Sequence, residues 1–322
     1  MTLQALYDVP APAKLNLFLH VVGRRANGYH LLQSPFMLID WADTLHFERR
    51  EDGRLFRHDM GASLPTDDLC LRAARALQTA SGSTLGADIH IVKQLPTGAG
   101  MGGGSSDAAT TLLALNRLWG LKWSRQRLSE LALGLGADVP FFVGGDNAFV
   151  QGIGEELTPI DLLPADYVVI KPAASLPTAD IFSHPRLVRD TERVILAGYL
   201  EQAQMLGRIE NKSNNKSSSK TGFWKPDHGD FGRNDLQGPA QECCAEVAQA
   251  AAWLLQRFGN SRMTGSGSAV FARADEKSVK KIEQNTGKVE SLVSSNLAEM
   301  PQAWTGRHCR SLARHPLKDW AS

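Results

Sequence analysis

Cysteine is scarce in this chain, and long apolar runs are missing. The 322 residues include four cysteines, with one adjacent pair and no Cys-x-x-Cys motif: Cys70, Cys243, Cys244 and Cys309. This spacing excludes a disulfide framework or a Cys-based zinc site and is typical of reduced thiols. No apolar stretch approaches the ~18 residues of a membrane-spanning helix. Because the N-terminus has no basic segment followed by an apolar one, we expect a cytoplasmic protein that does not contact the membrane.

An excess of charge of either sign is also missing. The 35 Lys and Arg residues oppose 34 Asp and Glu residues, which leaves a net charge of +1. We therefore expect no nucleic-acid partner. The length allows a large core divided between two domains. Residues 211–220 have no apolar side chain, and we expect them to form a disordered surface loop.

Glycine, by contrast, is concentrated in one loop. Residues 95–110 read LPTGAGMGGGSSDAAT, with five glycines. A loop without side chains lets backbone N–H groups close on an anion. Residues 87–93 before it alternate like a strand, and the leucines after it have helical spacing. We expect Ser105 or Ser106 to cap this helix and Asp107 to complement its positive end. The unit predicts a phosphate-binding site.

Three common phosphate loops fit this segment poorly. Gly98, Gly100 and Gly103 have the spacing of a dinucleotide-binding fingerprint, but no acidic residue follows about 20 positions later. A Walker A loop needs lysine after its last glycine, where this chain has serine. The His-Arg-Asp catalytic loop of protein kinases is absent, although residues 230–232 read Asp-Phe-Gly. A flexible linker is the remaining alternative, and the flanking strand and helix patterns disfavour it.

Residues 96–106 resemble the second motif of the GHMP kinase superfamily, a group of small-molecule kinases. Residues 11–17 (APAKLNL) resemble its N-terminal motif, and residues 263–271 (MTGSGSAVF) resemble its C-terminal glycine motif. The resemblance implies an α+β fold with two domains. They are a ribosomal-protein-S5-like ATP-binding domain over residues 1–160 and a ferredoxin-like domain over residues 161–322. The 211–220 insertion and a tail beyond about residue 299 fall outside the resemblance.

Further segments are similar to one branch of the superfamily, which phosphorylates a cytidine diphosphate-linked methylerythritol. They are residues 14–17, 23–30, 136–142, 176–178 and 233–236. The resemblance implies transfer of a phosphoryl group from ATP to the 2-hydroxyl of that substrate, with Mg²⁺ as cofactor. A monomer or a weak dimer is expected. A homoserine-type or mevalonate-type kinase and a non-catalytic nucleotide-binding module stay open as alternatives.

Two charged residues are candidates for the chemistry. Asp138 lies in a Gly-Ala-Asp-Val-Pro turn, which can present a carboxylate to a cleft as a base or simply cap the turn. Lys14 is the one cation of residues 11–22, so it is functional or extends its ammonium to solvent. The resemblance implies that Lys14 pairs with Asp138 and keeps the carboxylate ionised. Asn16 points to the same side of the expected strand as Lys14.

The remaining site residues come from the resemblance. Tyr29 is expected to stack on the cytosine, His30 to read its polar edge and Phe182 to stack on the opposite face. An unmatched Tyr-His pair would otherwise be ordinary partly buried surface. The expected ATP-binding residues are Pro96, Thr97, Gly98, Ala99, Gly100, Met101, Gly102, Gly103, Gly104, Ser105 and Ser106. The other expected substrate-binding residues are Asn16, Thr178, Gly265, Ser266 and Gly267. No protein ligand for a metal is assigned.

Hydrophobic periodicity also predicts the main elements. The expected strands are residues 14–22, 44–50, 87–93, 141–150 and 167–171, and the expected helices are residues 69–80, a segment opened by Ser124, and residues 239–258.

Overall fold

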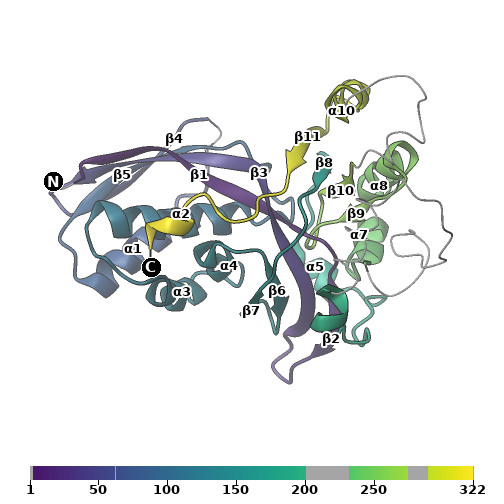
Figure 1. Ribbon diagram of the computed structural model, residues 1–322, viewed down its shortest axis with the longest axis horizontal. Coiled ribbons are helices and arrows are strands. Elements are labelled where there is room, and N and C mark those ends of the chain that lie inside the picture. The colour runs from purple at the N-terminus through teal and green to yellow at the C-terminus, as the bar shows by residue number, and fades with distance from the viewer. Residues whose placement is uncertain (1–2, 62, 201–231, 275–288, 322) are drawn as a thin grey trace, which may run out of the picture.

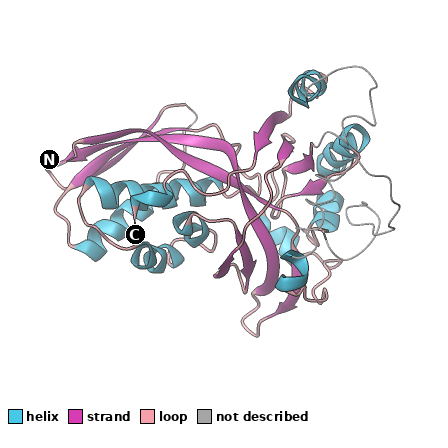
Figure 2. Cartoon of the chain, in the orientation of Figure 1, coloured by secondary structure: helices cyan, strands magenta, loops and turns pink. Residues whose placement is uncertain are grey.

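The computed structural model describes residues 3–61, 63–200, 232–274 and 289–321, so the 211–220 segment lies outside the described residues. Two β-sheets, each covered by helices, make up the molecule (Figure 1 and Figure 2). The α+β class is therefore confirmed. The predicted division near residue 160 falls between the last strand of one sheet and the first strand of the other.

The larger sheet has seven strands and is organised around β3. Its order is β4-β5-β3-β6-β7, and β1 and β2 also pair with β3, both antiparallel. The strands are β1 (Ala5–Asn16), β2 (His20–Arg24), β3 (His30–Arg50), β4 (Leu55–Asp59), β5 (Gly86–Val92), β6 (Ala148–Gln151) and β7 (Glu156–Pro159). Strand β3 runs the length of the larger sheet, from β5 at one end to β2 and β6 at the other (Figure 1).

Four helices cover one face of the larger sheet. They are α1 (Leu69–Ser81), α2 (Gly103–Leu118), α3 (Arg125–Leu133) and α4 (Val139–Gly144). Leu45 and Phe47 of β3 are fully buried against this layer, together with Leu112 and Leu115 of α2. Burial of such a side chain contributes roughly 1.5–3 kcal/mol relative to exposure. Alternating apolar residues on strands and helical spacing on α2 thus produce one shared core.

The smaller sheet is antiparallel and has the order β11-β8-β10-β9. Its strands are β8 (Asp166–Lys171), β9 (Arg262–Met263), β10 (Val270–Arg273) and β11 (Thr305–Arg310), and the helices of this half are α5 (Thr178–Ser183), α7 (Gln237–Cys243), α8 (Ala245–Phe258) and α10 (Val289–Ala298). Val168, Val169 and Ile170 are fully buried, as expected for a continuous apolar strand.

The structure corrects several predicted elements. The first half of the strand predicted over residues 141–150 is helix α4, and the strand β6 begins only at Ala148. The strand predicted over residues 14–22 is divided between β1 and β2. The helix predicted from Pro239 begins at Gln237 and is broken at Cys244, which has extended backbone angles. Short apolar runs of this kind suit a buried strand and a buried helix equally, so their pattern does not decide between them.

The predicted cap of α2 was wrong, whereas that of α3 is confirmed. Ser124 accepts a hydrogen bond from Arg127 N at the start of α3. Helix α2 has Gly102 at its N-cap and no side-chain cap bond. Ser106 instead donates to Pro12 O at 2.7 Å, and Asp107 pairs with Lys93 at 2.7 Å. Tertiary partners therefore take both side chains away from the helix terminus.

The segment after β11 returns to the first half of the molecule. Ser311 pairs with Ile39 and Arg314 pairs with Asp146 as isolated bridges. Leu317 is buried in the core of the larger sheet, beside the short helix η1 (Lys318–Trp320). The yellow C-terminal segment therefore lies beside α2 and α4 in Figure 1.

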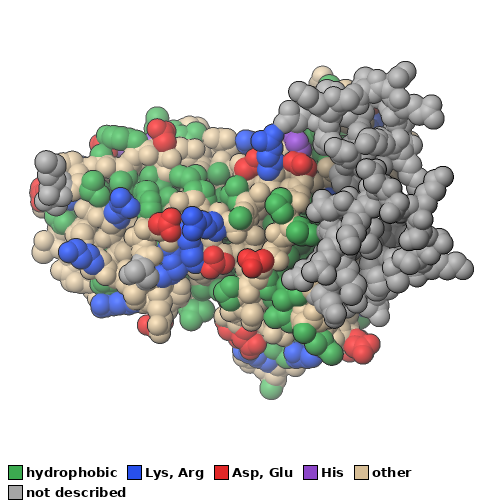
Figure 3. All heavy atoms as spheres, in the orientation of Figure 1, with side chains coloured by type: hydrophobic (Ala, Val, Ile, Leu, Met, Phe, Trp, Pro, Cys, Tyr) green, Lys and Arg blue, Asp and Glu red, His purple; other side chains and the backbone are tan. Residues whose placement is uncertain are grey.

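The face drawn in Figure 3 carries Lys and Arg beside Asp and Glu over the N-terminal half. Among the described residues, no helix has the length and apolar character that a membrane crossing requires.

Candidate active site

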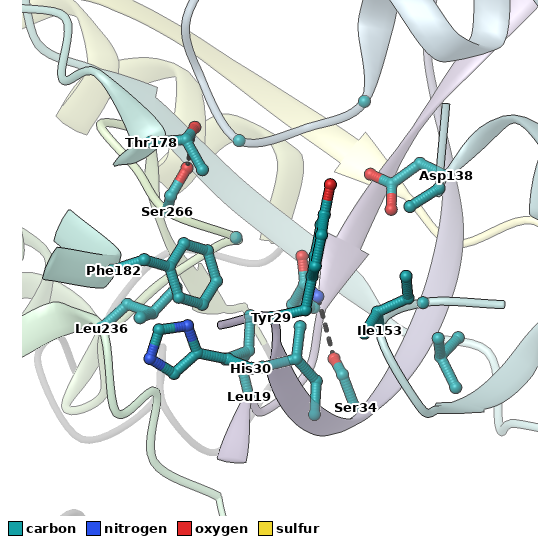
Figure 4. A pocket seen from close by; sticks show the side chains of 18 of the residues that line it. Leu19, Tyr29, His30, Ser34, Asp138, Ile153, Thr178, Phe182, Leu236 and Ser266 are labelled. Atoms are coloured by element: carbon teal, nitrogen blue, oxygen red, sulfur yellow. Dashed lines mark hydrogen bonds between the residues drawn. The ribbon is translucent and has the colours of Figure 1, made fainter. Parts of the chain in front are cut away.

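A cavity of roughly 790 Å³ opens between the two halves of the molecule (Figure 4). Strands β1 and β3, the loop before α4, helix α5 and the loop after β9 all contribute to its wall. The predicted residues on this wall are Lys14, Asn16, Tyr29, His30, Asp138, Thr178, Phe182, Gly265 and Ser266. Residues far apart in the sequence therefore meet at one site, as the resemblance implied.

Lys14 and Asp138 lie side by side on this wall. Lys14 Nζ is 3.5 Å from Asp138 Oδ2, and the ammonium also lies 4.3 Å from the centre of the Phe36 ring. The Lys14 side chain is 4% exposed, against 31% for Asp138. Burial lowers the pKa of Lys14, and the attraction of Asp138 opposes this effect. The lysine thus does not extend to solvent, and the carboxylate is the member of the pair that a substrate can reach.

Local structure explains why this pair forms. Lys14 occupies the buried end of β1, where its backbone N donates to Met101 O of the glycine loop at 3.0 Å. Asp138 stands at the N-cap of α4 but makes no cap bond there. Its carboxylate therefore remains available to Lys14 and to the cavity.

Asn16 connects the pair to the C-terminal half. Its Oδ1 accepts a hydrogen bond from Lys14 Nζ at 2.5 Å, and its Nδ2 donates to Ser34 Oγ at 2.9 Å. Its backbone N donates to Thr264 Oγ1 at 3.0 Å. Because Asn16 is 1% exposed and bonded at each of these atoms, it orients Lys14. Ser34 was missed as a site residue because a lone serine on a strand carries no distinctive sequence signal. Thr264 was missed although it lies inside the 263–271 motif.

A second cavity of roughly 370 Å³ lies against the glycine loop. All predicted loop residues from Pro96 to Ser105 line it, whereas the buried Ser106 does not. Gly100, Gly102 and Ser105 line both cavities, so the two spaces meet at the loop. The smaller cavity therefore adjoins the larger one, whose wall carries Lys14 and Asp138.

The glycine loop packs directly on the loop after β9. A Cβ atom on Gly100 would lie 2.3 Å from Thr264 O, and the φ angle of Gly100 is +73°. Ser268 N donates to Gly98 O at 3.1 Å and Ala269 N donates to Ala99 O at 3.2 Å. The second and third motifs thus form one backbone-bonded unit. Gly267 is part of this contact and does not line the larger cavity.

Three charged residues beneath the glycine loop were missed as site residues. Lys93 Nζ donates to Asp107 Oδ2 at 2.7 Å and to Asp43 Oδ2. Asp43 Oδ1 also accepts from the backbone N atoms of Gln94 and Leu95. Burial raises the pKa of Asp107, and Lys93 opposes this shift. Lys93 and Asp107 line the smaller cavity. A lysine that ends a strand just before a glycine loop was the available signal.

The far end of the larger cavity is aromatic. In Figure 4, Tyr29 stands between Asp138 and the pair formed by His30 and Phe182. The rings of His30 and Phe182 are stacked, with centroids 5.1 Å apart and planes 30° apart. Tyr29 is 60% exposed, which leaves its ring face accessible to a ligand. Thr178 Oγ1 and Ser266 Oγ lie 2.8 Å apart across the upper edge.

Two family models match the chain. Residues 68–146 match the GHMP kinases N terminal domain, and residues 224–288 match the GHMP kinases C terminal domain. With two cavities that meet at a glycine loop, the chain has the two-domain fold of a GHMP-type small-molecule kinase.

Several relatives match nearly the whole chain. A protein of Methylibium petroleiphilum named 4-diphosphocytidyl-2-C-methyl-D-erythritol kinase is 57% identical over 321 residues, which cover 100% of both chains. A protein of the same name from Variovorax paradoxus is 52% identical and covers 99% of this chain and 100% of its own. The chain therefore belongs to the 4-diphosphocytidyl-2-C-methyl-D-erythritol kinase family of the GHMP kinases.

Solved structures agree with this assignment. The crystal structure of a 4-(cytidine 5'-diphospho)-2C-methyl-D-erythritol kinase has a TM-score of 0.70 at 30% identity, covering 94% of this chain and 98% of its own. A mevalonate kinase has a TM-score of 0.61 at 12% identity, covering 95% and 99% of the two chains, and shares the fold alone.

Proposed function

We propose that this chain transfers the γ-phosphoryl group of ATP to the 2-hydroxyl of 4-diphosphocytidyl-2-C-methyl-D-erythritol. Relatives of 57% and 52% identity carry the name of this kinase. The observation that carries the proposal is the junction of the two cavities beside Lys14 and Asp138. A phosphate on the glycine loop and a hydroxyl beside the carboxylate would meet there.

The proposed chemistry is a direct displacement. The substrate oxygen forms a bond to the γ-phosphorus while the bond from that phosphorus to the β-phosphate oxygen breaks, and ADP leaves. Asp138 Oδ2 accepts the hydroxyl proton. Lys14, 3.5 Å away, orients the carboxylate. Asn16 holds the lysine through its 2.5 Å hydrogen bond.

The residues beside the glycine loop offer oxygen atoms to a magnesium ion that arrives with ATP. Asp107 Oδ1 is buried and has no hydrogen-bond partner among the described residues, and Ser105 lines the same cavity. Mg²⁺ is commonly held by one or two protein oxygens together with phosphates and water. Asp107 and Ser105 would hold it, and the ion would neutralise phosphate charge.

The aromatic end of the larger cavity suits a pyrimidine base. Tyr29 offers an exposed ring face, while His30 and Phe182 form a second aromatic surface. Aromatic stacking combined with hydrogen bonds to the base edge is a common mode of recognition for unpaired bases. These residues would select the cytidine portion, and the glycine loop would bind the phosphates of ATP.

Substitution of the proposed base tests the reaction. Asp138→Asn is expected to lower the single-turnover rate of ADP formation by about 10²- to 10⁴-fold, since the hydroxyl proton loses its acceptor. Asp161→Asn is a matched control, because Asp161 is exposed and lines neither cavity. Near-normal turnover by Asp138→Asn would remove the assigned base.

The alternative functions, another GHMP kinase or a nucleotide-binding module, differ in the phosphoryl acceptor that they require. ADP formation with mevalonate or homoserine, and none with the cytidylated erythritol, would favour another GHMP kinase. Nucleotide binding without turnover of any acceptor would indicate a binding module. The cytoplasmic location and the monomeric or weakly dimeric state stay predictions, which cell fractionation and sedimentation can check.

A further inference from the structure

Arg189 holds the outer nitrogen of His30, although it was not predicted to belong to the site. Arg189 Nε donates to His30 Nε2 at 3.1 Å. The Phe182 ring also restrains the imidazole, because the two rings are stacked with centroids 5.1 Å apart. The imidazole is therefore fixed both in its plane and in its rotation. His30 lines the larger cavity, and Arg189 stands behind it.

The guanidinium is itself anchored. Its Nη1 donates to Leu187 O at 2.9 Å, and its Nη2 donates to the carbonyls of Phe182 and His184 at 3.1 Å and 3.0 Å. Arg189 thus joins the end of α5 and the following turn to the histidine. An arginine that is bonded at three nitrogen atoms cannot turn away without breaking several hydrogen bonds.

The direction of the hydrogen bond determines the tautomer of the histidine. A guanidinium has donors and no acceptor, so His30 Nε2 must be the acceptor. A neutral imidazole that accepts at Nε2 carries its hydrogen on Nδ1. Burial lowers the pKa of His30, and the positive charges of Arg189 and Arg24 lower it further. The ring is therefore neutral and has one N–H donor in a defined place.

We propose that Arg189 is a positioning residue that fixes His30 as the Nδ1–H tautomer, so that the cavity presents a hydrogen-bond donor to the pyrimidine edge. This inference rests on the proposed function for its cytidine ligand. Cytosine has two acceptors on that edge, N3 and O2, whereas uracil carries a hydrogen on N3. The Nδ1–H of His30 can therefore donate to N3 of cytosine, whereas in uracil it would meet another donor, N3–H.

The tautomer can be measured without any substrate. In ¹⁵N-histidine NMR spectra of the ligand-free protein, with His30→Ala to assign the signal, we expect the wild-type ring to be protonated at Nδ1. In Arg189→Met, His30 Nε2 no longer accepts a hydrogen bond from the guanidinium, and we expect the Nε2–H tautomer to appear. Arg186→Met is the control, because Arg186 lies on the same segment, is 73% exposed and pairs with Glu242. An Nε2–H ring in the wild-type protein would overturn the proposal.

Substrate selectivity provides the second measurement. The ratio of kcat/KM for the cytidine substrate to that for its uridine analogue is expected to fall about tenfold in Arg189→Met. The KM for ATP should not change, because Arg189 does not line the glycine-loop cavity. If Arg189 had a merely structural role, its loss would lower kcat/KM equally for both substrates and leave the ratio at its wild-type value. That result would overturn the proposal.

The two levels of inference can fail separately. If the wild-type protein phosphorylates neither the cytidine nor the uridine compound, the proposed function fails. The NMR measurement on the unmodified protein still decides whether Arg189 sets the tautomer.

Discussion

At the scale of single residues, the site combines a buried cation with a partly exposed carboxylate. Lys14 is 4% exposed on its side chain and Asp138 is 31% exposed. An ammonium buried without a partner would lose its proton, because burial disfavours the charged form. Asp138, Asn16 and the face of Phe36 all surround Lys14 and favour its charge. The same attraction holds the Asp138 carboxylate beside the larger cavity, where it is partly exposed.

The buried side chain of His315 makes the stability of the folded protein depend on pH. It is 1% exposed, and its Nδ1 accepts a hydrogen bond from Leu317 N at 3.0 Å. Burial and the nearby Arg125 lower the pKa of His315 to about 3. The unfolded chain takes up this proton below about pH 6.5, whereas the folded chain does not. Stability from this group is therefore complete above pH 6.5 and is lost as the pH falls.

We expect this residue to remove about 2 kcal/mol from the free energy of unfolding between pH 7 and pH 5. Urea denaturation of the wild-type protein and of His315→Asn at both pH values measures the difference, and the variant should lose less stability on acidification. The rise in the pKa of Asp107 acts in the opposite direction and is common to both proteins, so it cancels. Parallel loss of stability in the two proteins would contradict the assignment.

At the scale of elements, the glycine loop is defined by what packs on it as much as by its sequence. Five glycines predict a loop that can bind phosphate, but a flexible linker has a similar composition. The backbone bonds from Ser268 to Gly98 and from Ala269 to Ala99 fix the loop against β10. A loop fixed in this way loses less conformational entropy when it binds a ligand than a flexible linker would.

Gly100→Ala tests this contact. The new Cβ would lie 2.3 Å from Thr264 O, so the second and third motifs must separate. We expect the KM for ATP to rise at least about tenfold because loop geometry is lost. Gly82→Ala is the matched control: its φ is +66°, similar to the +73° of Gly100, but its Cβ would meet nothing within 4 Å.

The control variant should lose about 1 kcal/mol of stability from backbone strain and keep its KM for ATP. Steady-state kinetics with thermal melting separates the two effects. Equal KM values in the two variants would mean that strain, not the approach to Thr264, explains the need for glycine at position 100.

At the scale of the whole molecule, the C-terminal segment is hydrogen-bonded to helices α3 and α4. Arg125 at the start of α3 donates to the carbonyls of Val143, Leu317, Lys318 and Ala321. Lys318 donates to Gly144 O at 2.8 Å. The C-terminal segment is thereby attached to the end of α4, the helix that Asp138 begins. In Figure 1 this segment runs back from β11 to the helical layer.

Removal of this connection should destabilise the protein. In Arg125→Ala, four carbonyls lose a charged donor, and we expect a loss of about 2–4 kcal/mol in the free energy of unfolding. Arg127→Ala alters an exposed arginine on the same helix, whose guanidinium lies over the Trp123 ring, and should lower stability by about 1 kcal/mol or less. Chemical denaturation measures both. An unchanged midpoint for Arg125→Ala would show that the C-terminal segment contributes nothing to the stability of this layer.

Sequence patterns predicted the long elements and the residues with unusual chemistry. Helix α1 was expected over residues 69–80 and spans Leu69–Ser81, and strand β5 was expected over residues 87–93 and spans Gly86–Val92. Both have strong periodicity and clear terminal signals. Residues 141–144, which belong to helix α4, were expected to begin a strand over residues 141–150, since this apolar run shows neither period.

The sequence by itself determined the class of this protein, because three spaced motifs and one lone lysine in an apolar strand carry chemistry that can be recognised locally. Tertiary structure alone decided which side chains meet. Lys14 contacts Asp138, which lies 124 positions later in the sequence (138 minus 14). Arg189 is hydrogen-bonded to His30 across 159 positions, and Arg125 is hydrogen-bonded to Lys318 across 193. Such contacts depend on how sheets and helices pack over long distances, and periodicity describes only neighbours along the chain.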